Sequence, residues 1–291
     1  MSLFESLESD GSVSLRSLFN GEDIEGTSSL TLEKLAFASV RGGWPASVKE
    51  EPPIALRVVK EFVKAVVNND ISRVDGVEKN PRRVRKLMQS LARNISTPVK
   101  MKTILNDVTW AIDKDAISDK TFTSYMNALR RLFVIETLPA WSPSIRSRVA
   151  LRTSAKCYFV DPSIATALLR VSPQDLMHDL KTFGLLFEAL CIRDLRIYAQ
   201  ATEGEVYHYR DGSDLEVDAI IEAGDGRWGA AEVKMGEGAI EDAVKNLKKL
   251  RDKVDHDEEG APSFLMVLTA TDHAYRRKDG VYVVPIGCLR E

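Results

Sequence analysis

The stretch LEVDAIIEAGDGRWGAAEVKMG, residues 215–236, contains two apolar segments joined by a glycine-rich turn. Both segments have the composition of buried β-strands, and the turn sequence GDGR is typical of a hairpin. Acids interrupt the segments at Asp218 and Glu232, and Lys234 follows two residues after the second acid. Charged groups near buried strands are costly unless they are paired or bound to metal. The stretch therefore predicts a β-hairpin that carries a site.

The spacing of these residues indicates a metal site. Asp218 and Glu232 are 14 residues apart on two strands joined by a tight turn. Adjacent strands lie about 4.8 Å apart, so both carboxylates can reach one ion. Two carboxylates, completed by waters and phosphate oxygens, suit Mg²⁺, and we take Mn²⁺ as its substitute. Strand alternation places Lys234 on the face of Glu232, where it could orient a water or stabilise charge on a phosphate.

The segments around the hairpin complete a mixed fold. A long apolar-striped helix is expected at about 179–198, before the hairpin. The other expected elements are strands at 205–210, 215–223 and 228–235, a helix at 239–254, and strands at 263–270 and 280–286. The order is helix, three strands, helix, two strands. The predicted fold class is therefore α+β, with a mixed β-sheet flanked by helices.

The first half of the chain is expected to be helical. Apolar residues recur at helical spacing at about 31–39, 53–68, 81–95 and 101–108. In ISDKTFTSYMNALRRLFVIETLPAW, residues 117–141, Ser118 is a plausible N-cap of a further helix, and a strand follows it. Helix, short turn, polar-faced helix and strand is the order of a winged helix, whose second helix lies in the major groove in DNA-binding members. Its predicted nucleic-acid contacts are Lys120, Thr123, Asn127, Arg130 and Arg131.

A winged helix also serves as a plain protein–protein module, so the fold alone does not fix DNA binding. Charge favours DNA as a partner. Residues 79–156 carry 16 basic and 5 acidic side chains, whereas residues 1–78 carry 8 and 13, and residues 157–291 carry 16 and 25. The basic block is a candidate polyanion-binding surface. The alternative is that it pairs with its acidic neighbours.

Other functions are not expected. No run approaches the ~18 apolar residues of a membrane helix, and the acidic start lacks the features of a signal peptide, so no membrane partner is predicted. Three scattered cysteines indicate reduced thiols and a cytoplasmic location. The four histidines have no metal-ligand spacing and are expected on the surface or in loops. No GxxxxGK[ST] motif occurs, so no nucleotide-binding residues are predicted. Homo-oligomerisation stays open.

With these elements in place, the chain resembles the PD-(D/E)XK nuclease superfamily. The resemblance implies that Asp218 and Glu232 bind metal and that Lys234 is catalytic. Glu188 matches the acid that many members carry on the preceding helix, and would be an auxiliary catalytic residue. The chain departs from the family pattern at Val217, where a proline usually precedes the first acid.

A second resemblance covers nearly the whole chain. Six motifs in order are similar to the C-terminal region of a prokaryotic family of AAA-type (P-loop) ATPases: SLFES, GGWPAS, YFVDPSIATALL, FGLLFEALCIRDL, YHYRDGSDLEVDAIIE and AAEVKMG. In that family SLFES lies just after the ATPase core. The resemblance implies that a P-loop domain, absent from these residues, would be the partner that binds ATP. No ATPase activity is expected from this chain alone.

These observations predict three regions. Residues 1–50 would follow an ATPase core, residues 51–150 would form a helical winged-helix domain, and residues 151–291 would form a restriction-endonuclease-like domain. The predicted function is a DNA-associated module with an Mg²⁺-dependent site for phosphodiester hydrolysis. The alternative is a non-catalytic DNA- or protein-binding regulatory module with a degenerate nuclease fold. A purely structural role for the acids and lysine, as ion pairs within the sheet, also stays open.

Overall fold

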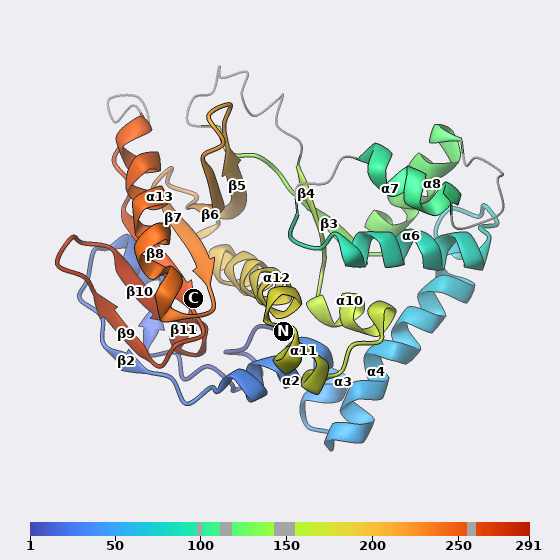
Figure 1. Ribbon diagram of the computed structural model, residues 1–291, viewed down its shortest axis with the longest axis horizontal. Helices are drawn as coiled ribbons and strands as arrows, with labels where there is room; N and C mark the ends of the chain where they lie inside the picture. The colour runs from blue at the N-terminus through green and yellow to red at the C-terminus, as the bar shows by residue number, and fades with distance from the viewer. Residues whose placement is uncertain (98–100, 111–117, 143–154, 255–259) are drawn as a thin grey trace. The chain divides into compact units, whose positions relative to one another are not determined.

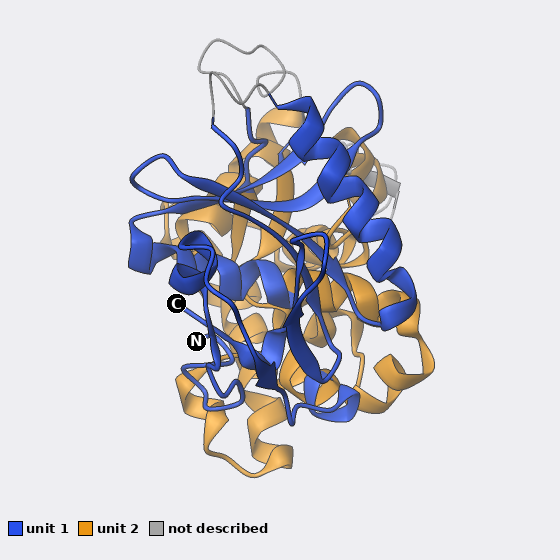
Figure 2. Ribbon diagram, turned by 90° about the vertical axis from the view of Figure 1, so that its left-hand side faces the viewer, with its two compact units in different colours: residues 1–35, 138–155, 190–291 blue, residues 36–137, 156–189 orange. Residues whose placement is uncertain are grey.

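The computed structural model describes residues 1–97, 101–110, 118–142, 155–254 and 260–291 (Figure 1). The chain forms two compact units that are each discontinuous in sequence (Figure 2). Unit 1 contains residues 1–35, 138–155 and 190–291, and unit 2 contains residues 36–137 and 156–189. With 50% helix and 19% strand, the α+β class is confirmed. The three predicted domains were continuous in sequence, and their boundaries stay a prediction.

Unit 2 is mainly helical, and proline begins many of its helices. Proline suits the first helical turn because the N–H that it lacks would have no partner there. The helices are α2 (Leu32–Arg41), which begins in unit 1, α3 (Pro45–Val48), α4 (Pro52–Ala65), the π-helix η1 (Val66–Asp70), α5 (Ile71–Arg73), α6 (Pro81–Arg93), α7 (Met101–Trp110), α8 (Asp119–Arg131), α10 (Pro162–Leu169), α11 (Pro173–His178) and α12 (Leu180–Ala199), which ends in unit 1. Within the described residues, no helix has the length and apolar character that crossing a membrane requires.

The winged-helix order is present in unit 2. Helices α6, α7 and α8 precede strands β3 (Ile135–Leu138) and β4 (Lys156–Phe159), which pair with each other. The hydroxyl of Ser118 accepts a hydrogen bond from the Thr121 N–H, so the predicted N-cap is confirmed. The strand expected after this helix begins only at Ile135, because a turn centred on Phe133 precedes it.

Unit 1 is built on a seven-stranded mixed sheet with the order β2-β9-β10-β8-β7-β6-β5. Its strands are β2 (Gly26–Thr27), β5 (Glu205–Arg210), β6 (Glu216–Glu222), β7 (Trp228–Lys234), β8 (Phe264–Thr269), β9 (His273–Arg276) and β10 (Tyr282–Pro285). Strands β5, β6 and β7 are antiparallel, and β8 runs parallel to both β7 and β10. Helix α13 (Ile240–Lys253) makes the crossover from β7 to β8. The predicted order is confirmed, and β2 and β9 are additions to it.

A single apolar layer joins α13 to the sheet. Residues at helical spacing on α13 pack against inward-facing residues of β6, β7, β8 and β10. The buried members from α13 are Ile240, Ala243, Val244, Leu247 and Leu250. On β7, Trp228 and Ala230 belong to this layer, and strand alternation sets Glu232 and Lys234 on the same face. The candidate site therefore lies where the apolar layer ends.

The N-terminal residues are part of unit 1. Strand β1 (Val13–Ser14) pairs in parallel with β11 (Leu289–Arg290), and the short helix α1 (Leu15–Phe19) follows. The Leu3 N–H donates to Asp194 Oδ2 at 2.9 Å. Asp194 is fully buried and ion-paired with Arg193 at 2.7 Å, and burial raises the pKa of Asp194 despite that partner. The short 3₁₀ helices η2 (Gln200–Thr202), η3 (Glu237–Ala239) and η4 (Ile286–Cys288) complete the unit.

The expectation that all four histidines are superficial is wrong for His208, which is buried on β5. The His208 N–H donates to the Pro139 carbonyl at 3.0 Å, and the His208 carbonyl accepts from the Trp141 N–H at 2.7 Å. The segment 139–141, which follows β3, thus covers the outer edge of β5. When another segment covers an edge strand in this way, side chains of that strand become buried although the sequence alone suggests that they are exposed.

Candidate functional site

The structure brings Asp218, Glu232 and Lys234 together on β6 and β7. Lys234 Nζ lies 2.6 Å from Glu232 Oε2 and 3.5 Å from Asp218 Oδ2. The Glu232 side chain is 3% exposed, that of Asp218 is 13% exposed and that of Lys234 is 29% exposed. One ammonium therefore contacts two carboxylates that sit mostly below the surface, and the lysine is the member that reaches solvent.

A local opening of the hairpin creates the space for these side chains. The β6–β7 ladder pairs Glu222 with Trp228 at the turn and continues to the pair Ala219–Ala231. Beyond that pair, the Val233 N–H donates to the Asp218 Oδ2 at 2.9 Å. The carboxylate thus replaces a backbone acceptor on the neighbouring strand. Asp218 is fixed in position by a main-chain donor, while β7 continues its pairing with β8 on the other side.

Burial dominates the electrostatics of Glu232. Loss of water contact is the main cause that raises its pKa, the nearby Asp218 charge also raises it, and Lys234 lowers it, so that the pKa of Glu232 is about 8. A carboxyl group with such a pKa holds a proton more readily than an ordinary glutamate does. A second cation at this site would favour the ionised form of Glu232, because a nearby positive charge stabilises the carboxylate as Lys234 does.

Helix α13 contributes a residue that the sequence did not single out. Asn246 Nδ2 donates to Glu232 Oε1 at 3.4 Å, so both oxygens of that carboxylate have a donor. Asn246 also lines a cavity of about 490 Å³. The other lining residues are Ser213, Asp214, Leu215, Lys249, Asp252 and Lys253. In the sequence, Asn246 is a polar residue on the sheet-facing side of an amphipathic helix. The many lysines of α13 make this signal difficult to recognise.

The donor set fits a hard divalent cation held by few protein ligands. Asp218 and Glu232 offer carboxylate oxygens within reach of one positive group, as the position of Lys234 shows. No group of three or more His, Cys, Asp or Glu side chains within the described ranges has the arrangement of a metal site. The chemistry of two carboxylates suits Mg²⁺, which usually keeps several waters and takes only one or two carboxylates from the protein.

Glu188 belongs to the other compact unit. Its carboxylate accepts a hydrogen bond from Tyr158 Oη at 2.7 Å, and Oε1 lies 3.4 Å from Lys156 Nζ. The Lys156 side chain is 2% exposed, so this is a buried ion pair that links β4 with α12. An auxiliary role for Glu188 beside the three site residues stays a prediction.

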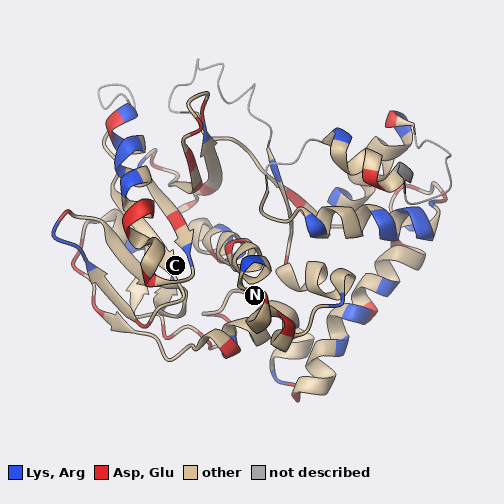
Figure 3. Ribbon diagram, in the orientation of Figure 1, with Lys and Arg blue, Asp and Glu red and all other residues tan. Residues whose placement is uncertain are grey.

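The outward face of α8 lies in unit 2. Lys120, Thr123, Asn127, Arg130 and Arg131 are all exposed, as the amphipathic pattern predicts. Arg130 donates to Asn127 Oδ1 at 3.3 Å. None of the three cations forms an ion pair with a carboxylate in the described part of the chain. Figure 3 marks the Lys and Arg positions along the ribbons of α6 and α8 in blue. These five residues, which we call the α8 face, also line a cavity of about 570 Å³ together with Asp75, Ser124 and Ala128.

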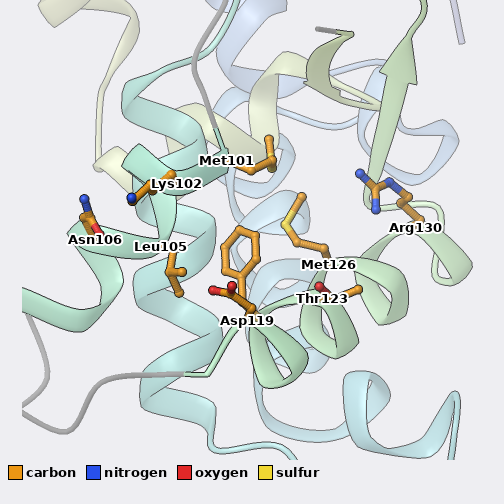
Figure 4. A pocket seen from close by; sticks show the side chains of 9 residues that line it. Met101, Lys102, Leu105, Asn106, Asp119, Thr123, Met126 and Arg130 are labelled. Carbon is orange, nitrogen blue, oxygen red and sulfur yellow. The ribbon is translucent and has the colours of Figure 1, made fainter. Parts of the chain in front are cut away.

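A third cavity, of about 480 Å³, lies between α7 and α8 (Figure 4). Met101 and Leu105 from α7 and Phe122 and Met126 from α8 supply apolar walls. The remaining lining residues are polar or charged: Lys102, Asn106, Asp119, Thr123 and Arg130. The cavity shares Thr123 and Arg130 with the α8 face, so one side of that face borders on an apolar recess.

Two family matches cover most of the chain. Residues 32–175 match a family described as a domain of unknown function (DUF8612), and residues 183–289 match another described as a domain of unknown function (DUF4143). The second is typically a C-terminal domain of AAA-ATPase-like proteins. No curated protein and no solved structure matches the chain. The matched region 183–289 contains Asp218, Glu232 and Lys234, and the region 32–175 contains the α8 face.

Proposed function

We propose that this chain is a DNA-associated C-terminal part of an AAA-ATPase-like protein, with a Mg²⁺-dependent site for phosphodiester hydrolysis. The observation that carries the proposal is that the Lys234 ammonium lies within 3.5 Å of both the Asp218 and the Glu232 carboxylate. Their placement on a hairpin followed by a helix and a parallel strand agrees with the resemblance to PD-(D/E)XK nucleases. Any ATP-dependent step belongs to a P-loop domain outside these residues.

Each residue has a distinct role in this proposal. Asp218 and Glu232 hold the cation, Mg²⁺ or Mn²⁺, which when bound acidifies a water and offsets charge on the phosphate. Val233 keeps Asp218 in place through its N–H, and Asn246 does the same for Glu232. Lys234 is then released from its ion pairs and orients the attacking water or stabilises the phosphate. In hydrolysis, the water would lose a proton as its oxygen forms the new bond to phosphorus, the ester bond would break, and the leaving oxygen would take up a proton.

DNA association rests on the α8 face. Its three cations form no direct ion pair with a carboxylate among the described residues, although Arg131 helps to lower the pKa of Asp75, and its Thr and Asn side chains can donate and accept hydrogen bonds. Such a face suits phosphate oxygens and base edges. Exposure of all five residues supports a free surface, since a face buried by other parts of the chain would have favoured a structural role.

A cleavage assay with Mg²⁺ or Mn²⁺ on single- and double-stranded DNA tests the proposal. The wild type is compared with Glu232→Gln and Lys234→Met. Glu241→Gln and Lys245→Met are matched controls, because these residues are exposed acids and bases of the same unit. We expect cleavage by the wild type and both controls and its loss in both site variants. Cleavage that survives in Glu232→Gln would refute the assignment of the site.

A non-catalytic binding module is the second candidate, and one observation favours it. Lys234 already pairs with both carboxylates, as expected of a site in which the three charges only stabilise the sheet. In that case the wild type binds DNA but does not cleave it with either cation. Loss of Lys234 would then reduce stability without changing DNA binding.

A further inference from the structure

Phe133 is an exposed aromatic residue in an unusual backbone conformation. It follows the last turn of α8, where its N–H donates to the Arg130 carbonyl at 3.0 Å and the Val134 N–H donates to the Leu129 carbonyl at 3.0 Å. Its φ angle is 51°, in the left-handed region. Helices often end on such a residue, but glycine or asparagine usually occupies it, because a side chain there is strained.

The side chain of Phe133 has no packing role that would explain why a phenylalanine occupies this strained position. It is 78% exposed, whereas Leu129 and Val134, the residues that close the turn, are fully buried. Among the described residues, no aromatic ring and no cation stacks on Phe133. Glycine would therefore make the same turn with less strain. A bulky group kept at a strained position suggests a function outside the core.

The surroundings of Phe133 are cationic. Arg130 and Arg131 precede Phe133 by three and two residues in the chain, and both are exposed and form no ion pair with a described carboxylate. Leu7 offers a contrast, since it is also exposed (88%) with a positive φ of 64°. Its neighbours in sequence are acidic, at Glu5 and Glu8. Only the first of these two strained apolar residues lies beside groups that attract a polyanion.

We propose that Phe133 stacks on an unpaired nucleobase while Arg130 and Arg131 contact the flanking phosphates. The partner would therefore be DNA with unpaired bases, as a single strand or beside a duplex end. This inference rests on the proposed DNA association and specifies that the bound DNA has unpaired bases. A base in a continuous duplex has both faces covered by its neighbours, whereas an unpaired base offers a face to an aromatic ring. Stacking of this kind accepts any base, so no sequence preference is expected from it.

The test measures the affinity of the full chain for a fluorescein-labelled single strand and for a duplex of the same sequence. Phe133→Gly removes the ring and relieves the backbone, so its melting temperature should equal or exceed that of the wild type. We expect its affinity for the single strand to fall about tenfold and its affinity for the duplex to stay within about twofold. Phe133→Trp should retain single-strand affinity, and 2-aminopurine in the strand should report the stacking. Leu7→Gly is the matched control and should change neither affinity.

Several results would overturn the inference. An unchanged single-strand affinity in Phe133→Gly would show that the ring contacts no base, while DNA association through the α8 face would stand. Equal losses for single strand and duplex, or a lower melting temperature in Phe133→Gly, would indicate a packing role instead. If Phe133→Trp behaves like the glycine variant, stacking is wrong. If the wild type binds neither form of DNA, both the inference and the proposed DNA association fail.

Discussion

Protonation of Glu232 should make the stability of this protein depend on pH in an unusual direction. Burial raises the pKa of Glu232 to about 8 in the folded chain, against an ordinary value of 4.5. The folded state therefore binds the proton more tightly than the unfolded state does. The resulting stabilisation is fully present below about pH 4.5 and is lost as the pH rises through 8. Most buried carboxylates that pair with a cation show the opposite trend.

The size of the effect follows from the same values. About 1.4 kcal/mol for each pH unit between 4.5 and 8 gives an upper limit of about 5 kcal/mol. Lys234 at 2.6 Å offsets part of the charge, and water can enter when the site relaxes. We therefore expect the unfolding free energy to fall by about 2–3 kcal/mol between pH 5 and pH 9 because of this residue.

Urea unfolding followed by circular dichroism measures the contribution of Glu232 as the difference in unfolding free energy between the wild type and Glu232→Gln. Glu232→Gln keeps the shape of the side chain and removes its titration, so subtraction cancels the other groups. The variant should lose less stability than the wild type as the pH rises, and Mg²⁺ should stabilise the wild type more at pH 8 than at pH 5. Parallel pH profiles for the two proteins would refute the account of Glu232.

Three further changes test other parts of the structure. The double variant Arg130→Ala and Arg131→Ala should lower the slope of log affinity for DNA against log salt by about 2, measured by anisotropy, and an unchanged slope would exclude phosphate contacts at these residues. A methyl group at Gly229 would overlap the Phe264 ring, so Gly229→Ala should lower the free energy of unfolding in urea by about 1–3 kcal/mol. Ser118→Ala removes the N-cap of α8 and should cost about 1 kcal/mol, with retained stability counting against the cap.

Much of the fold could be predicted because its signals are local. The hairpin of β6 and β7 combines two apolar segments with a GDGR turn, and Gly226 takes the positive φ of 85° that the turn needs. Helix α8 has its cap and its apolar stripe within 14 consecutive residues, counting Ser118. The three site residues were recognisable because charge is rare in such strands, and the structure places them together.

Other features depend on partners distant in sequence, so they could not be predicted. Strands β2 and β9 are short; β2 pairs with β9 across more than 200 residues, and β9 also pairs with β10. His208 is buried because the segment at Pro139–Trp141 covers β5. Asn246 was missed because only the position of α13 over the sheet brings it to Glu232.

Titration of the chain with Mn²⁺, followed by the electron paramagnetic resonance signal of the free ion, tests the central claim most directly. The claim is that Asp218 and Glu232 hold one divalent cation. We predict that the wild type and Glu241→Gln each bind one Mn²⁺ per chain, and that Asp218→Asn and Glu232→Gln do not bind it. Absence of Mn²⁺ binding in the wild type, or binding that persists in both site variants, would contradict the account.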